Sequence, residues 1–500
     1  MKLSIAPEEA WDPLPAAQWD AAAVRHLLRR AGWGVVPARA QEALAEGLPA
    51  TLDRLFPAQP QAFPMPPSVA RLEAAQAGAE AEIRAQADPA QKRLLRRQLR
   101  ESARAALLDM TVDWLQFASE ADNAAYQKWV LFLSDIYVVG FEKVGRAPLI
   151  YRHFDLISAL GLGPAPVLTK AVSRSPAMVI YLDLGQNRAG APNENFAREL
   201  FELFVLGEGN YTERDIKEAA RAFTGYRLRG GSEFYFAPRQ HDPGPKTVFG
   251  HTGDFTGDDV IDLAYATPAA GAFVPHELVK FYLSDTMLPR EYLLALGDRW
   301  RSEGGYSLGW LARRFFGSRL FFAPEFRGEF IKSPVQFYLG MVQELDLDVL
   351  PAPRFVVSPL RQMGQVLYNP PNVRGWVGGR NWINSASLAA RRGLVESLFR
   401  PLDEGALNQD EWMAIQAAAA SGRGTFVVDD ARFSRLADAA PEAAAAHLAE
   451  SLLSVPPAPA FMATLAGFIA GPPAAGPGER LRRLRRASAA LLESPEYQLC

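Results

Sequence analysis

The fold is decided by residues 192–225, whose sequence is PNENFARELFELFVLGEGNYTERDIKEAARAFTG. This stretch predicts two helices joined by a short turn. Asn193 is a good N-cap for the first helix, and Gly207 ends it. Thr212 begins the second helix with Asp215 three residues later, which is the spacing of a capping box. The rest of the chain is expected to pack around this helix pair.

The first helix carries its polar side chains on one narrow stripe. At about 100° per residue, the stripe consists of Asn195, Arg198, Glu199 and Glu202. Phenylalanine and leucine cover most of the remaining surface, so the helix is expected to be buried. Its polar stripe must then face a polar cleft or another charged element.

The second helix offers such an element, because Arg214, Glu218 and Arg221 recur at i, i+4 and i+7 opposite an apolar face. Two interpretations follow. The acidic and basic side chains of the two stripes can pair with one another in a structural ion-pair network. Alternatively, they line a pocket of carboxylates and guanidinium groups, in which Glu199 or Glu202 is a candidate catalytic residue.

The overall composition is that of a helical globular protein. Of the 500 residues, 49% are hydrophobic and 22% are charged. Alanine, leucine, arginine and glutamate are abundant, which favours helices. We therefore predict a mainly α protein, a large multi-helix assembly with one inserted β-hairpin. The net charge of −3 does not favour nucleic acid as a partner, and the one cysteine, Cys500, excludes an intrachain disulfide.

Pro-rich breaks and changes in composition suggest three regions. They are an N-terminal arm (1–19), a helical core (20–400) and a loosely attached, Ala-rich helical C-terminal region (401–500). Within the core, residues 69–118 predict a projecting helical hairpin broken at Asp88-Pro89, and residues 226–255 predict the β-hairpin. The first 19 residues lack the apolar segment of a secretory signal, so we expect a cytoplasmic protein. No apolar run is long enough to span a membrane.

The predicted β-hairpin carries possible metal ligands. His241, Asp242, His251 and Asp254 lie close in sequence, and Glu199 or Glu202 could complete a shell around a divalent ion. The spacing matches no known metal motif, and Asp-Pro-Gly is common in turns. We therefore expect no cofactor, and instead expect His241 and Asp242 to dock the hairpin on the polar stripe, with Lys246 meeting a carboxylate.

A second cluster contains Arg374, Trp376, Trp382 and Asn384 among several glycines. Glycine lets the backbone adopt positive φ and brings the two indoles close together. Tryptophan and arginine suit stacking against a planar or sugar-like ligand. The same residues equally suit a tightly folded loop that packs on the helical core.

Several segments of the chain resemble one bacterial family, known as domain of unknown function 1800. The resembling segments are Leu27–Gly34, Pro176–Asp183, Asn193–Leu200, Tyr211-Thr212, Ala222–Gly225, His241–Gly244 with Lys246 and Gly250, and Gly364 to Arg391, which includes Pro370-Pro371-Asn372-Val373. The resemblance covers about residues 20 to 400 and implies a helical fold. It also implies a partner protein encoded nearby, because members are often encoded beside a second family of unknown function, and it implies no particular activity.

The chain departs from the family in one place. Members commonly carry a Trp-His-X-His-Phe-like run in the helix before the central pair, whereas the corresponding residues here, Phe132–Tyr137, contain no histidine. Any metal binding or proton transfer by those histidines would be lost in this chain.

Two hypotheses about function follow. The first is a non-catalytic binding or assembly protein whose oligomeric state is left open. Its recognition cleft is formed by the polar stripe and by the Trp-rich loop, the segment from Arg374 to Asn384. The second is a metal-assisted, hydrolase-like enzyme. In it, Glu199 or Glu202 is the general base, and His241 and Asp242 are ligands or a proton shuttle.

Overall fold

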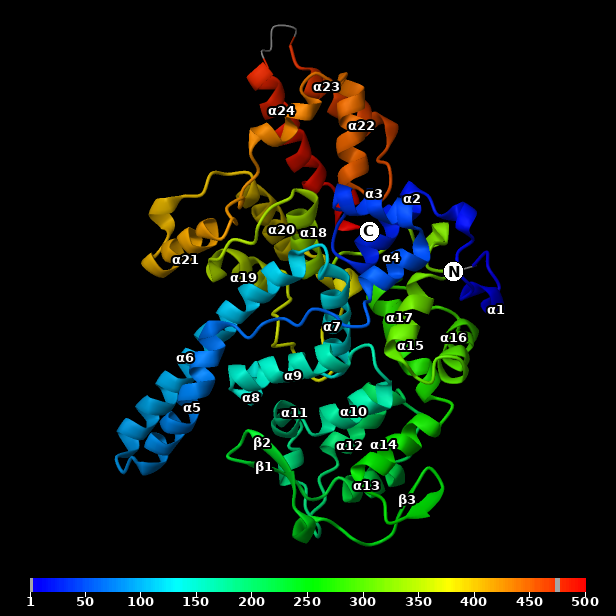
Figure 1. Cartoon of the computed structure of the whole chain (residues 1–500), viewed down its shortest axis with the longest axis vertical. Coiled ribbons are helices and arrows are strands. Elements are labelled where there is room, and N and C mark those ends of the chain that lie inside the picture. Colours follow the sequence, from blue (N-terminus) through cyan, green and yellow to red (C-terminus); the bar gives the residue numbers. More distant parts are fainter. Residues whose placement is uncertain (1–2, 473–476) are drawn as a thin grey trace.

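Helices make up almost all the regular structure of the protein (Figure 1). The computed structural model describes residues 3–472 and 477–500. Within these residues the sheet elements are two antiparallel strand pairs, so the prediction of a mainly α fold with a hairpin-like insert is confirmed. No helix of this described part is both long and apolar enough to span a membrane. The division of the chain into three regions stays a prediction.

The N-terminal elements pack on the middle of the chain. They are α1 (Pro7–Ala10), α2 (Ala21–Ala31), α3 (Pro37–Glu46) and α4 (Leu48–Leu55). Asp20 caps α2 by accepting a hydrogen bond from the Ala23 N–H at 2.8 Å. The predicted arm is held by Trp11, which is fully buried and donates its indole N–H to the carbonyl of Tyr292 at 2.7 Å.

A helical hairpin follows, formed by α5 (Pro67–Ala85) and α6 (Pro89–Ser119). The chain turns at Asp88, whose carboxylate accepts the Ala90 N–H at 2.9 Å, at the position that the sequence predicts. The far end of the hairpin extends away from the body (Figure 1, left). Its near end is anchored because the second half of α6 is buried, with Met110 fully enclosed.

Helix α7 (Ala124–Ile136) runs through the core and contacts α2, α4, α9 and α15. Elements that follow it are α8 (Phe141–Val144), α9 (Ala147–Leu160), α10 (Ala165–Ser173) and α11 (Pro176–Tyr181). Most of α7 is apolar, and Trp129 is fully buried. A lysine and an aspartate interrupt this apolar surface, namely Lys128, which is buried, and Asp135, which is partly exposed.

The central helix pair differs from its prediction in one respect. The α-helix α12 covers only Asn195–Glu199, and the chain continues as the π-helix η3 (Leu200–Val205) before α13 (Glu213–Ala222). In the π-helix, the Leu206 N–H donates to the carbonyl of Phe201, five residues earlier, at 3.0 Å. A π-helix has more residues per turn than an α-helix, so the regular 100° spacing ends within the predicted polar stripe.

The inserted β-structure consists of two short ribbons. Strand β1 (Tyr226–Arg229) pairs with β2 (Glu233–Phe236), and β3 (Lys246–Val248) pairs with β4 (His251–Gly253). The β3 strand packs on α13, where Val248 is fully buried. The insert is therefore fixed to the second helix of the central pair.

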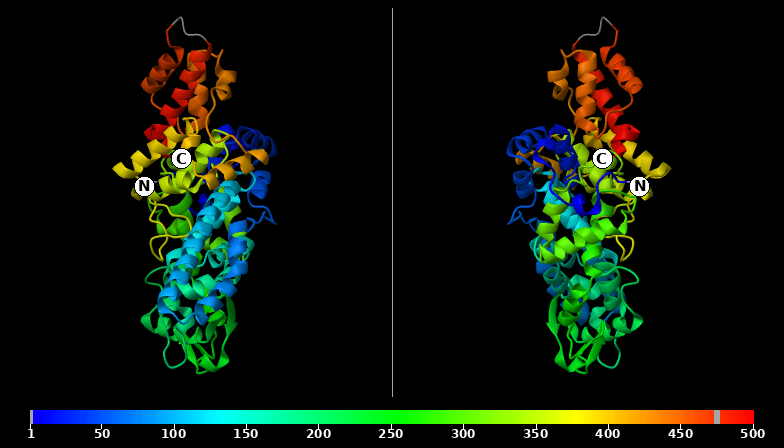
Figure 2. Two further views of the ribbon diagram at one scale, coloured as in Figure 1. Left: turned by 90° about the vertical axis from the view of Figure 1, so that its left-hand side faces the viewer. Right: turned by 90° about the vertical axis from the view of Figure 1, so that its right-hand side faces the viewer.

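The remaining helices complete the body and one end of the elongated molecule (Figure 2). They are α14 (Gly257–Ala266), α15 (Ala270–Tyr282), α16 (Arg290–Ser302), α17 (Leu308–Phe316), α18 (Pro334–Glu344), α19 (Pro353–Gln362), α20 (Ser385–Leu398), α21 (Gln409–Ala420), α22 (Pro441–Leu452), α23 (Pro459–Ala470) and α24 (Pro477–Glu493).

The expectation of a loosely attached C-terminal region was wrong at the last residues. The Cys500 N–H donates to the Phe330 carbonyl at 2.9 Å, and the Lys332 N–H donates to the Gln498 carbonyl at 2.8 Å. Tyr497 is fully buried between these contacts. The segment after α24 thus pairs with the main chain just before α18.

Candidate functional site

A groove of about 860 Å³ lies between the end of η3, with its following turn, and the helices α15 and α16. Its apolar lining includes Leu203, Leu206, Phe273 and Leu294. Polar and charged side chains contribute a comparable share of the lining, among them Arg374 from the Trp-rich loop. A concave surface that combines apolar side chains with polar groups can bind a ligand.

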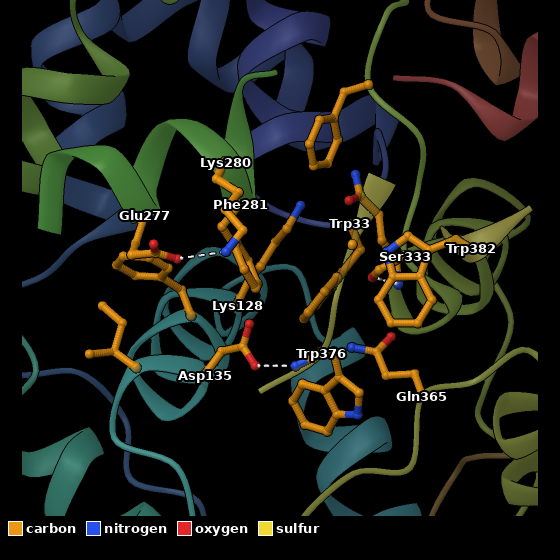
Figure 3. A pocket seen from close by; sticks show the side chains of 15 residues that line it. Trp33, Lys128, Asp135, Glu277, Lys280, Phe281, Ser333, Gln365, Trp376 and Trp382 are labelled. Carbon is orange, nitrogen blue, oxygen red and sulfur yellow. Dashed lines mark hydrogen bonds and ion pairs between the residues drawn. The ribbon is translucent and has the colours of Figure 1, made fainter. Parts of the chain in front are cut away.

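A smaller cavity of about 50 Å³ adjoins the groove (Figure 3). Glu277 and Lys280 line both spaces, so the groove and the cavity are neighbours. The two side chains form an ion pair of 3.2 Å at this junction. Aromatic side chains dominate the cavity wall, namely Trp33, Phe132, Phe281, Phe330, Trp376 and Trp382. The volume suffices for a few water molecules or one small chemical group.

The carboxylate of Asp135 lies in the cavity wall, on the last turn of α7 (Figure 3). Its Oδ1 accepts the main-chain N–H of Trp376 at 2.9 Å. Burial raises the pKa of Asp135 to about 7, and the negative charge of Glu277 adds to this rise. The Oδ2 atom accepts no hydrogen bond from the described residues, so it is available to accept one from a molecule bound in the cavity.

Lys128 lies two turns earlier on α7 and reaches the same cavity. Its Nζ donates to the carbonyls of Arg30 at 2.8 Å and of Gly32 at 2.9 Å. The ammonium also faces the ring of Trp33, 5.4 Å from its centroid. Burial lowers the pKa of Lys128 to about 7. A shifted carboxyl and a shifted amine beside one cavity are features of functional sites.

Two glycines shape the loop that carries the tryptophans. Gly375 has a φ of +75°, and a Cβ there would lie 2.0 Å from the Oδ1 atom of Asp135. Gly379 has a φ of +65°, and a Cβ there would lie 2.6 Å from Asp285. Glycine is required at both positions. The loop can therefore lie against α7 and place Trp376 in the cavity wall.

Arg374 joins this loop to the central helix pair. Its Nη2 atom lies 2.6 Å from Glu202 Oε1 and 2.7 Å from Glu208 Oε1. Tyr211 donates its hydroxyl to the other oxygen of Glu202 at 3.1 Å. The predicted site residues Glu202 and Arg374 therefore meet at the rim of the groove. Burial, together with the charge of Glu202, raises the pKa of the neighbouring Glu199.

Other members of the predicted polar stripe have local roles. Arg198 pairs with the exposed Glu213 at 2.8 Å and with Glu194 at 3.2 Å, away from Glu202. The amide of Asn195 donates to the Leu182 carbonyl at 3.1 Å. The side chain of Asn193 accepts the Asn195 N–H at 3.0 Å, although Asn193 does not occupy the N-cap position itself, which belongs to Glu194.

The β3–β4 ribbon meets α13 and does not meet the carboxylates of the first helix. Arg221 Nε donates to Asp242 at 2.7 Å, and Arg221 also pairs with Glu218. The Nδ1 atom of His241 lies 3.0 Å from the Thr224 carbonyl. Asp242 therefore pairs with the charged face of the second helix, and no hydrogen bond or ion pair of the described residues joins His241 or Asp242 to Glu199 or Glu202. The charged side chains of the second helix thus form structural ion pairs, whereas Glu202 of the first helix faces the groove.

The prediction for Lys246 was wrong. This side chain is fully buried, and its Nζ donates to the main-chain carbonyl of Asp242 at 2.7 Å, not to a carboxylate. Burial lowers the pKa of Lys246. The lysine thus stabilises the turn that precedes β3.

The weak metal candidates are not brought together. The carboxylate of Asp242 forms an ion pair with Arg221, and His251 lies exposed on β4. Throughout residues 3–472 and 477–500, no group of three or more His, Cys, Asp or Glu side chains has the arrangement of a metal site. Asn384 is the N-cap of α20, where it forms a capping box with Ser387.

Sequence reasoning identified Arg374, Trp376 and Trp382 but missed Lys128, Asp135, Glu277 and Lys280. A signal for the first two was present in the sequence. The segment Tyr126–Tyr137 is almost entirely apolar, and a lysine and an aspartate within a core helix are unusual enough to suggest a site. Glu277 and Lys280 look like an ordinary exposed pair, so only their placement beside the cavity reveals them.

Comparisons with known proteins bear on the family alone. No curated protein and no solved structure gives a significant match to the chain. A family model described as "Protein of unknown function (DUF1800)" matches residues 26–499, nearly the whole length. With a match of this extent, the chain belongs to the DUF1800 family of proteins of unknown function.

Proposed function

We propose that this protein is a non-catalytic binding protein that captures a segment of a partner protein. The groove receives the segment, and the adjoining aromatic cavity receives one of its side chains. The observation that carries this proposal is that Glu277 and Lys280 line both the groove and the cavity, so the two spaces are neighbours. A large open groove beside a small aromatic cavity suits a chain with one anchoring group.

The chemistry of the walls supports a polypeptide ligand. Leu294 is exposed in the groove, and Phe273 and Leu203 stand beside it, so an apolar face can be buried there. Glu208 and Arg374 at the rim can meet polar groups of the same segment. Apolar walls with a polar rim are the usual anatomy of a protein interface.

The alternative of a metal-assisted hydrolase draws no support from the geometry. Its proposed base, Glu202, is held by Arg374 and Tyr211 on the groove side. Its proposed ligand Asp242 is held by Arg221 on α13. No hydrogen bond or ion pair in the described residues joins the two groups.

The test uses the full-length protein and the purified products of the adjacent genes, each titrated in turn by calorimetry. Leu294→Asp places a charge on the groove wall, and Trp376→Ala opens the cavity wall. Leu388→Asp is the matched control because Leu388 is similarly exposed, 43% against 37% for Leu294, but lies on α20 outside the groove.

The expected result is binding that weakens about tenfold or more in Leu294→Asp and Trp376→Ala and stays within about twofold in Leu388→Asp. Circular dichroism checks that each variant is folded. A partner that binds the folded Leu294→Asp and Trp376→Ala variants as tightly as the original protein would remove the groove from the recognition site. Equal loss in all three variants would overturn the proposal as well.

A further inference from the structure

A second groove, separate from the first, runs along the helical hairpin. It has a volume of about 380 Å³ and lies between α5, α6 and the short helix α8 with its following turn. The left-hand view of Figure 2 looks onto the side of the molecule where the hairpin lies. None of the residues that line this groove lines the groove at η3 or the aromatic cavity.

Positive charge is concentrated in this hairpin groove. Its walls carry six cationic side chains, namely Arg84, Arg96, Arg100, Arg104, Lys143 and Arg146, and two carboxylates, Glu80 and Glu142. The formal charge of the lining is therefore 6 − 2 = +4, in a chain whose overall net charge is −3. Such a local excess attracts an acidic partner and raises its rate of association.

Two of the cations are free to bind a partner. Arg104 pairs with Glu142 at 3.2 Å, and Arg146 pairs with Glu80 at 2.7 Å. By contrast, no carboxylate of the described residues lies within 4.0 Å of the guanidinium group of Arg96 or Arg100. An unpaired guanidinium can bind a carboxylate through two parallel hydrogen bonds.

The spacing of these two arginines suits an extended polypeptide. Arg96 and Arg100 are four residues apart on α6, so they stand about 5–6 Å apart on one face of the helix. Alternate side chains of an extended chain are about 7 Å apart on one face. Two acidic residues separated by one position can therefore reach both guanidinium groups at once.

The floor of the groove distinguishes a polypeptide from a nucleic acid. Leu72 and Leu99, which are partly exposed, supply an aliphatic floor on which apolar side chains can pack. The one aromatic residue of the lining, Phe141, is 3% exposed, so it offers no ring face on which bases could stack.

From these observations we propose that the hairpin groove is a docking site for an acidic, partly apolar polypeptide segment. Arg96 and Arg100 bind two of its carboxylates, and the aliphatic floor accepts the apolar side chains between them. This inference does not depend on the proposed function of the first groove, because the two sites have no lining residue in common.

The test measures binding of a fluorescein-labelled synthetic peptide, with Glu at alternate positions and Leu and Ser between them, by fluorescence anisotropy on the full-length protein. The variant is Arg96→Glu with Arg100→Glu. The matched control is Arg482→Glu with Arg486→Glu, two exposed arginines that are also four residues apart, on α24. Both double substitutions change the net charge by −4.

The expected result is a dissociation constant about tenfold or more higher in the α6 double variant and changed less than about threefold in the α24 control. Binding should also weaken as the salt concentration rises. An equal loss in both double variants would show non-specific attraction and overturn the docking site. A labelled single-stranded polynucleotide that binds more tightly than the peptide, and is released by the α6 substitutions, would assign the groove to nucleic acid instead. Absence of peptide binding at low salt would also overturn the proposal.

Discussion

The main-chain N–H of Trp376 donates a 2.9 Å hydrogen bond to the carboxylate of Asp135, which joins the Trp-rich loop to the core helix α7. This contact connects residues 241 positions apart in the chain. It can form only because Gly375 has no Cβ, since that atom would occupy the position of the Asp135 carboxylate. The wall of the aromatic cavity therefore depends on one carboxylate and one glycine.

The first prediction concerns Gly375→Ala. The added Cβ would lie 2.0 Å from Asp135 Oδ1, so the loop must move away from α7 in addition to bearing an unfavourable φ. We expect a loss of about 3 kcal/mol or more in the free energy of unfolding, because a clash adds to the backbone strain. Thermal unfolding followed by circular dichroism measures it.

Gly190→Ala is the control for this prediction. Gly190 also has a positive φ, +81°, but no atom lies within 4 Å of an added Cβ. Its cost should be the backbone strain alone, about 1–2 kcal/mol. If the two variants unfold at the same temperature, the close approach of Gly375 to Asp135 does not restrain the loop.

The second prediction concerns Asp135→Asn, whose amide oxygen can still accept the Trp376 N–H. The pKa of Asp135 is about 7 in the folded protein, against about 3.9 for an aspartate in the unfolded chain. Between these values the folded state keeps a proton that the unfolded state releases, so raising the pH destabilises the original protein. Asparagine does not titrate, so this loss disappears in the variant.

The melting temperature of Asp135→Asn, relative to the original protein, should therefore rise from about pH 4 to about pH 7 and then stay level. Asp438→Asn, at an exposed position on the surface, is the control for the removal of one carboxylate. A difference for Asp135→Asn that does not change with pH would show that its carboxyl is not held in the protonated form.

The fold class could be predicted from the sequence because each helix signal is local. The capping box of Thr212 and Asp215, and the break at Asp88-Pro89, occur where the sequence places them. The π-helix η3 could not be predicted, because its i to i+5 hydrogen bonds depend on packing around Phe201 and not on residue preference. This change of period is why Glu202 faces the groove while Arg198 turns to the surface.

The site could be predicted only in part, for a related reason. Trp376 and Trp382 attract attention in the sequence because tryptophan and glycine cluster there. Their partners come from distant segments, with Asp135 on α7 and Glu277 on α15, and no local pattern brings these helices together. The sequence also did not show that Asp242 would pair with Arg221 on α13, or that His241 would contact Thr224 just after it.

The third prediction concerns Asp242→Asn. The hydrogen bonds from Arg221 hold the pKa of Asp242 below its usual value, so the carboxylate stabilises the fold above the pKa of the unfolded chain, about 3.9. This contribution disappears as the pH falls through the lower, folded pKa. We expect a loss of about 1–3 kcal/mol at neutral pH that shrinks as the pH falls below the pKa of the unfolded chain, about 3.9, measured by urea unfolding.

Glu213→Gln is the matched control for Asp242→Asn. Glu213 also pairs with an arginine, at 2.8 Å, but its side chain is 67% exposed. Exposed pairs contribute little to stability, so its effect should be clearly smaller than that of Asp242→Asn. A loss in Asp242→Asn that is the same at neutral pH and near pH 3 would mean that the charge of the carboxylate does not hold the ribbon.

The last prediction concerns Arg374→Ala, which breaks the contact between the Trp-rich loop and Glu202 and Glu208. Because Arg374 is half exposed, global stability should change by less than about 1 kcal/mol. The loop itself should open more often, since one of its two attachments is lost. Hydrogen exchange of the Trp376 amide, which is protected by Asp135, reports this opening.

We expect faster exchange in Arg374→Ala and no change in Arg392→Ala, whose arginine is also exposed and paired but lies on α20. Unchanged exchange in both variants would mean that the bond between Trp376 and Asp135 holds the cavity wall without help from the rim of the groove.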